Sequence, residues 1–460
     1  MRGTRTRRTH AGRAVIATAS GAIDRVRTEV ESRPWWYTTF LAIGFITMLT
    51  AVGVLFFGIN SGPSTLVISD EVPAVDSLDF GVAISRLAGA PIERGGTIQV
   101  LNNGDEFLPA LFQAIDGAKA SINFSVYIWE DGAISDQLLD KLIRKQRQGV
   151  EVRILLDGLG GRKAPDDRLD ALEKVGGRVR KFRMPKFGSW TRFHRRNHRR
   201  SIVIDGEIGF TGGMAVADQW LGHAQDPEHW RDMMFRLTGT LASSLQGAFV
   251  DEWASSSAEL LVGPRIFPIA SATSSAGVER FINKINSPAD DDHSMDYFFV
   301  LPILAARERV YVTTPYFIPD GPLMKALEKK AQAGLDVRLL LPGPVTDNRM
   351  ARFSGQSRYD ALLKAGVRIY EYQPTFLHAK GLAVDGKWSI VGSPNLNSRS
   401  RELDEENAFG ILDASLGARL DEVFIADLRH SKEITSDAWR RRNPLLRVLQ
   451  GASRVLDQQS

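Results

Sequence analysis

The sequence predicts an α/β fold made of two related halves, preceded by one transmembrane helix. Three observations predict it. Strand-like and helix-like segments alternate from about residue 96 onward, their order recurs after about 180 to 190 residues, and a long apolar stretch stands near the N-terminus. Alternating strands and helices are typical of layered α/β domains, and the recurrence indicates a pseudo-twofold pair.

The apolar stretch is the first element. No charged residue occurs from Pro34 to Ser69, and the 25 residues from Trp35 to Ile59 are enough to cross a hydrocarbon layer of about 30 Å. Arginines precede the stretch and acidic residues follow it, so the positive-inside rule predicts a basic cytoplasmic tail over 1–33, a transmembrane helix over 34–60 and an extracytoplasmic body. A cleaved signal peptide is the alternative, but the leader and the apolar run both exceed its normal dimensions.

Composition limits the chemistry of the body. The 460 residues contain no cysteine, which excludes disulfides, zinc thiolate sites, iron–sulfur clusters and thiol nucleophiles. Eight arginines and three acids lie in 1–33, and the other 427 residues hold 50 basic and 51 acidic side chains. A near-neutral body argues against a nucleic-acid-binding protein.

One local exception is the run 178–200, with ten Lys or Arg, no acid and interleaved aromatic residues. We expect it to face anionic lipid headgroups. The same pattern also fits single-stranded nucleic acid, which keeps a nuclease open as an alternative.

The repeat is visible in three pairs of strand-like segments. They are 121–129 and 309–317, 149–156 and 334–341, and 177–180 and 366–369. The predicted organisation beyond the membrane helix is a linker over 61–95, a first domain over 96–262, a linker over 263–290, a second domain over 291–430, and a basic amphipathic segment over 431–460.

The residues with catalytic character repeat as well. Each half has a histidine, a cation two residues later and an aspartate seven residues later. These are His198, Arg200 and Asp205 in the first half, and His378, Lys380 and Asp385 in the second. Alternate residues of a strand share a face, so the histidine and the cation can address one phosphate, whereas the aspartate has the opposite parity and braces the site from behind.

Small residues follow each motif at the same spacing. They are Gly212 and Gly213 in the first half, and Gly392, Ser393 and the nearby Asn395 in the second. Glycine lets backbone N–H groups approach an anion closely. The combination suits a phosphodiester substrate, with two imidazoles as nucleophile and general acid and with cations that stabilise the phosphoryl oxygens.

With these motifs, the chain resembles the phospholipase D superfamily and, within it, the bacterial cardiolipin synthases. The resemblance runs from about residue 90 to 430 and includes Trp230–Asp232, Thr314–Asp320 and Gly392–Ser400. It implies two phospholipase D-like α/β sandwich halves with one active site at their interface. It also implies transfer through a phosphohistidine, with no metal and no other cofactor.

The resemblance implies a role for each residue. His198 attacks phosphorus, and His378 protonates the leaving alcohol and later deprotonates the incoming one. Asp232 and Glu406 orient the two imidazoles, and Asp205 and Asp385 count among the catalytic motif residues. Two positions depart from the family pattern, because Arg200 replaces the usual lysine and Ala215 replaces the asparagine that Asn395 retains. A weakly active first motif is therefore an alternative.

The implied reaction joins two phosphatidylglycerol molecules into cardiolipin and releases glycerol. The expected partners are anionic phospholipids and the membrane, with no nucleic acid, and the expected catalytic unit is a monomer. The alternatives are a phospholipase D hydrolase that releases phosphatidic acid, a nuclease of the same superfamily, and a non-catalytic lipid-binding protein.

Overall fold

The computed structural model describes residues 35–56, 66–182, 195–272, 276–287, 292–319, 321–442 and 450. They belong to two compact units, Met1–Gly62 and Pro63–Ser460. The predicted cytoplasmic tail lies outside the described residues. So do the middle of the basic run, 183–194, and most of the predicted C-terminal segment, 443–449 and 451–460.

The smaller unit contributes helix α2 (Trp35–Phe56), which falls inside the stretch predicted to cross the membrane. A search of the described residues finds no helix with both the length and the hydropathy of a membrane span. The transmembrane helix over 34–60 therefore stays a prediction.

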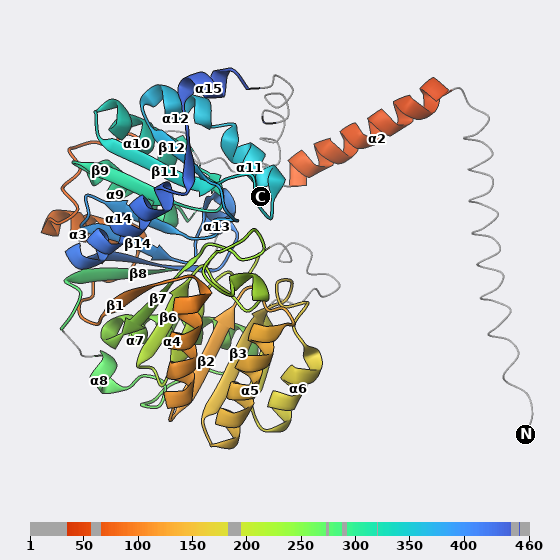
Figure 1. Cartoon of the computed structure of the whole chain (residues 1–460), viewed down its shortest axis with the longest axis vertical. Coiled ribbons are helices and arrows are strands. Elements are labelled where there is room, and N and C mark those ends of the chain that lie inside the picture. Colours follow the sequence, from red (N-terminus) through yellow and green to blue (C-terminus); the bar gives the residue numbers. More distant parts are fainter. Residues whose placement is uncertain are drawn as a thin grey trace, which may run out of the picture. The chain divides into compact units, whose positions relative to one another are not determined.

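The described part of the larger unit is a mixed α/β structure with two large sheets (Figure 1). The first sheet has the order β1-β7-β6-β5-β2-β3-β4. Its strands are β1 (Ile98–Asn102), β2 (Ser121–Val126), β3 (Glu151–Asp157), β4 (Arg178–Phe182), β5 (Ser201–Ile204), β6 (Ile208–Gly212) and β7 (Met233–Thr238).

The second sheet repeats that order and adds one strand. Read from β8, it runs β8-β16-β14-β13-β9-β11-β12-β17, so each strand of the first sheet has a counterpart at the same position. Its strands are β8 (Arg280–Asn286), β9 (Arg309–Thr313), β11 (Asp336–Pro342), β12 (Arg368–Tyr372), β13 (Gly381–Val384), β14 (Trp388–Gly392), β16 (Glu406–Leu412) and β17 (Ser431–Ile434). A separate short pair is β10 (Phe317–Ile318) with β15 (Leu396–Asn397). The predicted duplication of an α/β unit is thus confirmed.

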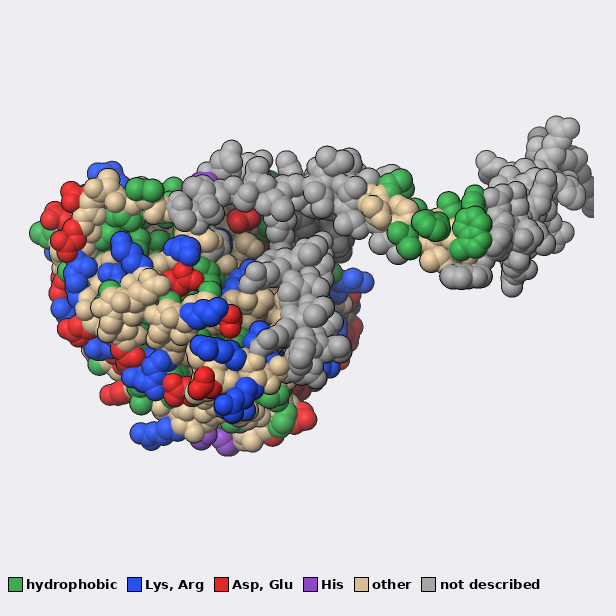
Figure 2. Space-filling view, turned by 90° about the horizontal axis from the view of Figure 1, so that it is seen from above, with side chains coloured by type: hydrophobic (Ala, Val, Ile, Leu, Met, Phe, Trp, Pro, Cys, Tyr) green, Lys and Arg blue, Asp and Glu red, His purple; other side chains and the backbone are tan. Residues whose placement is uncertain are grey.

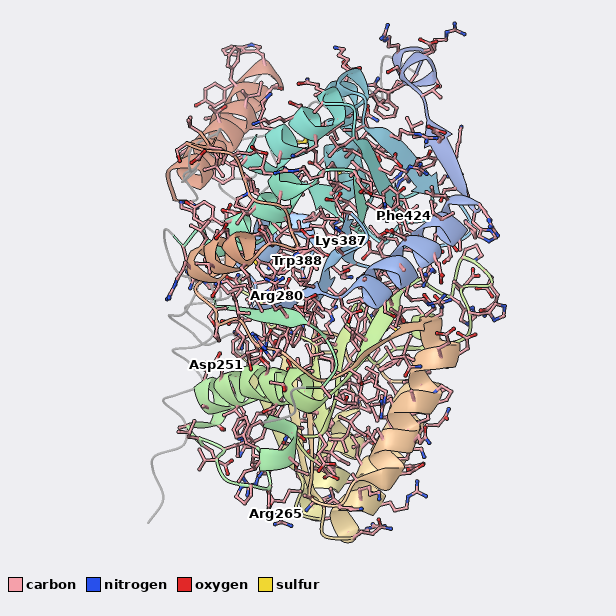
Figure 3. All side chains as sticks on the ribbon, turned by 90° about the vertical axis from the view of Figure 1, so that its left-hand side faces the viewer. Asp251, Arg265, Arg280, Lys387, Trp388 and Phe424 are labelled. Carbon is pink, nitrogen blue, oxygen red and sulfur yellow. The ribbon has the colours of Figure 1, made fainter. Side chains whose placement is uncertain are left out.

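Helices cover the sheets, and the chain between strands is mostly helical (Figures 1 and 3). Those of the first half are α4 (Asn103–Gly117), α5 (Ala133–Arg147), α6 (Asp166–Lys174), the short η2 (Asp218–Trp220), α7 (Gly239–Ser257) and α8 (Ile269–Ala272). Those of the second half are α9 (Ser294–Ala305), α10 (Gly321–Gln332), α11 (Arg349–Gln356), α12 (Tyr359–Ala365), α13 (Ser398–Glu402), α14 (Ala414–Leu428) and α15 (Ser436–Arg440).

The buried apolar side chains explain why the halves form one body. One large cluster belongs to the first half and another to the second. A third cluster combines residues of both sheets, including Val203 and Phe235 from the first and Tyr311 and Phe409 from the second. Because this shared core removes apolar surface of both sheets from water, it holds the halves together.

At three places, helices or strands lie outside the predicted domain ranges. Strand β8 lies inside the predicted linker 263–290, and β17 lies beyond the predicted end at 430. Helix α3 (Leu78–Ala88), inside the predicted linker 61–95, packs on the second half, where the rings of Phe80 and Trp388 are 5.1 Å apart. The sequences of β8 and β17 lack the alternation of a buried strand, and α3 lies far in sequence from Trp388, on which it packs.

The face seen in Figure 2 carries Lys and Arg side chains interspersed with Asp and Glu. No large area of one sign stands out among the side chains drawn in colour. This mixture agrees with the near-neutral charge of the chain beyond residue 33.

Candidate active site

The two histidine motifs are held by backbone hydrogen bonds that cross from one half to the other. The N–H of His198 donates to the carbonyl of Glu405 at 3.0 Å, and the N–H of His378 donates to the carbonyl of Arg231 at 2.7 Å. Each motif thus pairs with the chain that carries the acidic residue of the opposite half. Reciprocal pairing of this kind is what a pseudo-twofold relation between the halves produces.

Each imidazole meets a carboxylate from the other half. Nδ1 of His198 lies 2.9 Å from Oε1 of Glu406, and Nδ1 of His378 lies 2.6 Å from Oδ2 of Asp232. Both carboxylates are fully buried. An ionised carboxylate accepts the Nδ1–H, which fixes the tautomer and leaves Nε2 with its lone pair available for chemistry.

Further donors fix the two carboxylates. Asp232 accepts the indole N–H of Trp220 at 2.8 Å and the backbone N–H of Met233 at 2.8 Å. Glu406 accepts the hydroxyl of Ser393. The histidines are therefore oriented by groups that are themselves immobilised.

The two cations occupy equivalent places. Nη1 of Arg200 donates to the carbonyl of His198 at 2.6 Å, and Nζ of Lys380 donates to the carbonyl of His378 at 2.6 Å. Lys380 also lies 3.1 Å from Nε2 of His378. Within the described residues, the buried Nε and Nη2 of Arg200 have no hydrogen-bond partner, so this guanidinium retains donors for an anion.

Electrostatic effects show that the two motifs face one another. Burial and the charges of Arg200 and Lys380 hold the pKa of His198 well below its usual range. Burial and the Lys380 and Arg200 charges, only partly offset by Asp232, lower the pKa of His378 to about 3. The cation of each half therefore lowers the pKa of the imidazole in the other half.

Burial also works against the charge on Lys380, whose pKa falls to about 7 although Asp232 opposes the change. The site therefore gathers buried cationic groups whose charge a bound anion would stabilise. A phosphate group supplies such a charge and has acceptor oxygens for their N–H groups.

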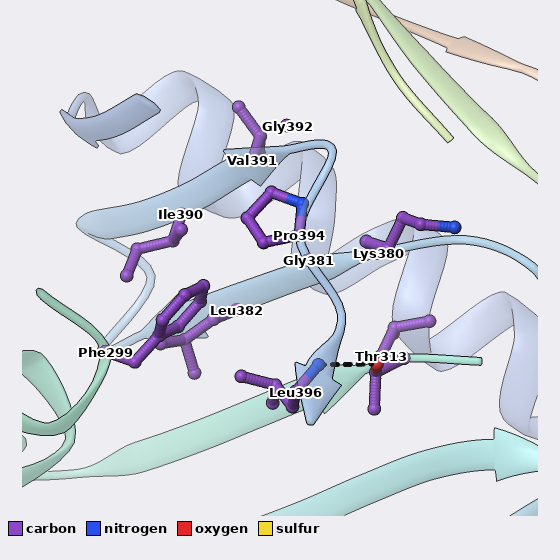
Figure 4. Close-up of a pocket in the computed structure, with 11 residues that line it drawn as sticks. Phe299, Thr313, Lys380, Gly381, Leu382, Ile390, Val391, Gly392, Pro394 and Leu396 are labelled. Atoms are coloured by element: carbon purple, nitrogen blue, oxygen red, sulfur yellow. Dashed lines mark hydrogen bonds between the residues drawn. The ribbon is translucent and has the colours of Figure 1, made fainter. Parts of the chain in front are cut away.

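Lys380 is supported by an apolar wall. A small pocket beside it is lined by Phe299, Leu382, Ile390 and Leu396, and the ammonium end of the side chain points away from them (Figure 4). The backbone N–H of Leu396 donates to the hydroxyl of Thr314 at 3.2 Å along this wall. Packing of the aliphatic stem leaves the charge directed at the histidine.

The small residues act differently from the sequence-based expectation. The N–H groups of Gly213 and Ser393 donate to the carbonyls of Met233 and Asn407, both at 3.0 Å, so the adjacent strands use these donors and they do not point at an anion. A Cβ at Gly213 would lie 2.1 Å from Oδ1 of Asp232. Glycine is therefore needed here to make room for the carboxylate.

The other small residues also have packing roles. Gly212 and Gly392 adopt φ values of 145° and 141°, and a Cβ on either would lie 2.5 Å or less from a carbonyl of the neighbouring strand. Asn395 is buried, and its backbone N–H donates to the hydroxyl of Ser400 at 3.1 Å.

Asp205 and Asp385 do not join the histidines. Asp205 accepts the backbone N–H groups of Lys119, Ala120 and Ser121, which lead into β2. Asp385 accepts the corresponding N–H groups of Arg307, Glu308 and Arg309, which lead into β9. Each follows the end of a four-residue strand that lies farther from the motif histidine. The expectation that they are catalytic is therefore corrected, because both carboxylates anchor the backbone at the start of a neighbouring strand.

Aromatic side chains around the imidazoles escaped the sequence-based analysis. The ring of Tyr127 lies 5.2 Å from that of His198, and the rings of Trp220, Trp230 and Phe376 lie 5.4 to 5.7 Å from that of His378. In sequence, Trp230 stands out only as the first residue of the motif Trp230–Asp232. In sequence, the other three look like ordinary core residues.

Comparisons with known proteins agree with this geometry. The family described as "Cardiolipin synthase, PLD-like domain" matches residues 111–229 and 302–428. The chain is 32% identical over 401 residues to cardiolipin synthase 1 of Bacillus anthracis, which covers 85% of this chain and 78% of that protein. The chain belongs to the phospholipase D-like cardiolipin synthase family.

A second member of this family, the cardiolipin synthase of Geobacillus kaustophilus, is 32% identical over 377 residues, covering 81% of this chain and 74% of its own. The crystal structure of a phosphatidylserine synthase from Haemophilus influenzae shares the fold, with a TM-score of 0.64 at 16% identity over 82% of this chain and 99% of that one. The protein is a phospholipase D-type phosphatidyltransferase of the cardiolipin synthase family.

Proposed function

We propose that this protein joins two phosphatidylglycerol molecules into cardiolipin and releases glycerol, through a phosphatidyl-histidine intermediate. The observation that carries the proposal is the reciprocal pairing of His198 with Glu406 and of His378 with Asp232, beside two cations. The names of the related proteins support the choice of product.

In the first step, the lone pair on Nε2 of His198 attacks the phosphorus of one phosphatidylglycerol. A P–N bond forms while the bond from phosphorus to the glycerol headgroup oxygen breaks, and that oxygen takes a proton from Nε2 of His378. A low pKa suits His198 for this role, because a neutral imidazole is the nucleophile.

In the second step, the hydroxyl of another phosphatidylglycerol gives its proton to His378. Its oxygen bonds to phosphorus as the P–N bond to His198 breaks, which returns both imidazoles to their starting states. Arg200 and Lys380 stabilise the negative charge on the phosphoryl oxygens in both steps.

His378 must be protonated to act as an acid, although its pKa in the free protein is about 3. The cationic neighbours contribute to that low value, and a bound phosphate brings a negative charge that opposes them. Substrate binding therefore raises the pKa of His378, so that the acid forms where it is needed.

The proposal includes a membrane anchor formed by the predicted span over 34–60. Large apolar side chains of α2, including Phe40, Leu41 and Phe45, are more than half exposed. Such exposure suits a helix surrounded by lipid. An anchor would keep the active site beside the bilayer that contains its substrates, with the body on the extracytoplasmic side.

The test is lipid extraction from membranes that express the wild type, His198→Ala or His378→Ala. We expect new cardiolipin with the wild type and none with either variant. If the wild type instead releases phosphatidic acid and forms no cardiolipin, the protein is a hydrolase. Cardiolipin formation by both variants would contradict the proposed mechanism.

A further inference from the structure

A tyrosine follows the same strand in each half and lies beside the site. Tyr127 follows β2 and Tyr316 follows β9, its counterpart in the second sheet. Tyr127 contacts His198, whereas the ring of Tyr316 lies 6.2 Å from that of Phe376, which is 5.7 Å from that of His378. Each histidine therefore has a tyrosine on its own flank.

The carboxylates associated with the two tyrosines differ. Asp157, the last residue of β3, is buried and accepts the backbone N–H groups of Leu159, Gly160 and Asn197 at 2.7 to 2.9 Å. On the His198 flank, the hydrogen bonds of the carboxylate thus hold the neighbouring backbone in place.

Asp347 follows β11, the counterpart of β3, and is exposed to solvent. Its Oδ2 accepts the hydroxyl of Tyr316, which is half-buried. On the His378 flank, the carboxylate and phenol thus form a polar pair that a ligand can reach.

The pair lies close to the cations that would hold the phosphate. Burial raises the pKa of Asp347, and the hydrogen bond from Tyr316 and the charge of Lys380 oppose that change. Burial likewise holds the pKa of Tyr316 well above its usual range, and the charge of Arg200 opposes it. The carboxylate of Asp347 would repel a second phosphate group, but it can accept hydrogen bonds from neutral hydroxyl groups.

We propose that Tyr316 and Asp347 bind the non-reacting hydroxyl groups of a glycerol headgroup on the His378 flank and so favour a polyol acceptor over water. This inference rests on the proposed function. Because His378 protonates the leaving alcohol and deprotonates the incoming one, both alcohols occupy its flank. A site for glycerol hydroxyls there would position first the leaving alcohol and then the incoming alcohol.

The experiment measures how the phosphatidyl-enzyme partitions between acceptors. The full-length protein in detergent micelles of phosphatidylglycerol is assayed with and without ethanol, and cardiolipin, phosphatidic acid and phosphatidylethanol are quantified. The variants are Tyr316→Phe, Asp347→Ala and Asp347→Asn. The control is Asp360→Asn, which removes an exposed carboxylate paired with Lys364 on α12.

We expect Asp347→Ala to lower the ratio of cardiolipin to phosphatidic acid about tenfold, as for the loss of one hydrogen bond to a charged group. Asp347→Asn, which keeps an acceptor oxygen, should recover part of that ratio, and Tyr316→Phe should lower it by a smaller factor. The ratio of phosphatidylethanol to phosphatidic acid should stay within twofold of wild type, since ethanol has no second hydroxyl. The control should match the wild type.

Unchanged cardiolipin ratios in Asp347→Ala and Tyr316→Phe would overturn the glycerol site and leave the proposed function intact. Equal losses in the cardiolipin and ethanol ratios would also overturn it, because they indicate a general structural effect. A wild type that forms no cardiolipin would contradict the proposed function itself.

Discussion

Residue 200 keeps the backbone contact of the cation in the other half although its side chain differs. Arg200 stands where the family usually has lysine, yet it donates to the carbonyl of His198 at the same 2.6 Å as Lys380 to that of His378. Its ring neighbour is Tyr127, with the guanidinium carbon 6.0 Å from the ring centre. The charge is therefore retained in place, while its shape differs from that of an ammonium.

We expect Arg200→Lys to keep cardiolipin formation within about tenfold of wild type, whereas Arg200→Ala should lose at least about a hundredfold because a stabilising charge is removed. Initial rates measured with purified variants check this. Similar rates for Arg200→Ala and wild type would indicate that the first motif is degenerate.

The pH dependence should report Glu406. Burial raises its pKa to about 7, against the opposing effects of Ser393 and Arg200. Below pH 7 the carboxyl is protonated and no longer accepts the Nδ1–H of His198, so the rate of glycerol release should fall about tenfold per pH unit there. The pKa of Lys380 is also about 7, so loss of its charge should lower the rate above pH 7. The pKa of Asp232 is lowered, so it stays ionised throughout.

Glu406→Gln should remove the fall in rate below pH 7 and lower the rate by about 10² to 10⁴, as expected for loss of the group that sets the histidine tautomer. An unchanged fall in rate below pH 7 in this variant would assign that ionisation to another group.

At the scale of elements, the strand ends decide how closely the acids approach the histidines. Gly213 follows β6, and its missing side chain leaves the space that the Asp232 carboxylate fills. A neighbouring element thus controls the orientation of His378 without touching the substrate.

We expect Gly213→Ala to displace Asp232, to lower cardiolipin formation at least about a hundredfold and to destabilise the fold by about 1–3 kcal/mol. Gly117→Ala is the matched control, since a Cβ at the end of α4 would meet nothing within 4 Å. The control should keep wild-type activity and gain up to about 1 kcal/mol. Urea unfolding measures the stability of each variant, and lipid assays measure its cardiolipin formation. Equal stability and equal activity of the two variants would contradict this account.

The elements also show what sequence can and cannot predict. The spacing of the repeat correctly indicates two equivalent α/β units, because local alternation reflects which faces are buried. Strand β8 was not predicted because four of its seven residues are polar, including Asn283 at its centre and Lys284 beside it. Edge strands carry a weaker apolar signal than central ones.

Contacts between the halves were harder to predict. Glu405 and Glu406 are adjacent in sequence, yet Glu405 pairs with Arg199 and Glu406 with His198, because alternate residues point to opposite sides. The family resemblance supplied Glu406 as an orienting acid, but its partner is fixed by a long-range contact between halves. The hydrogen bonds of Gly213 and Ser393 to adjacent strands are also long-range.

At the scale of the whole molecule, one buried arginine joins the two halves. Arg199 donates to the carbonyl of Ala248 and to Asp251 in the first half, and to the carbonyl of Asn286 and to Glu405 in the second, at 2.9 to 3.2 Å. Its side chain is fully buried. The shared core and this network therefore align the two motifs.

Arg199→Ala should destabilise the protein by about 3–5 kcal/mol, since it leaves buried acceptors and carboxylates unpaired. Arg368→Ala is the control, because its pair with Glu433 is exposed and contributes at most about 1 kcal/mol. Urea unfolding of both variants gives the comparison. A loss at Arg199 no larger than at Arg368 would contradict the joining role.

The most direct measurement of the central claim is mass spectrometry of the covalent intermediate. The wild type is mixed with a short-chain phosphatidylglycerol, quenched in denaturant at high pH and digested. We predict a phosphatidyl group on the peptide that contains His198, and none in His198→Asn. An adduct on His378, or cardiolipin formation by His198→Asn at the wild-type rate, would contradict the account.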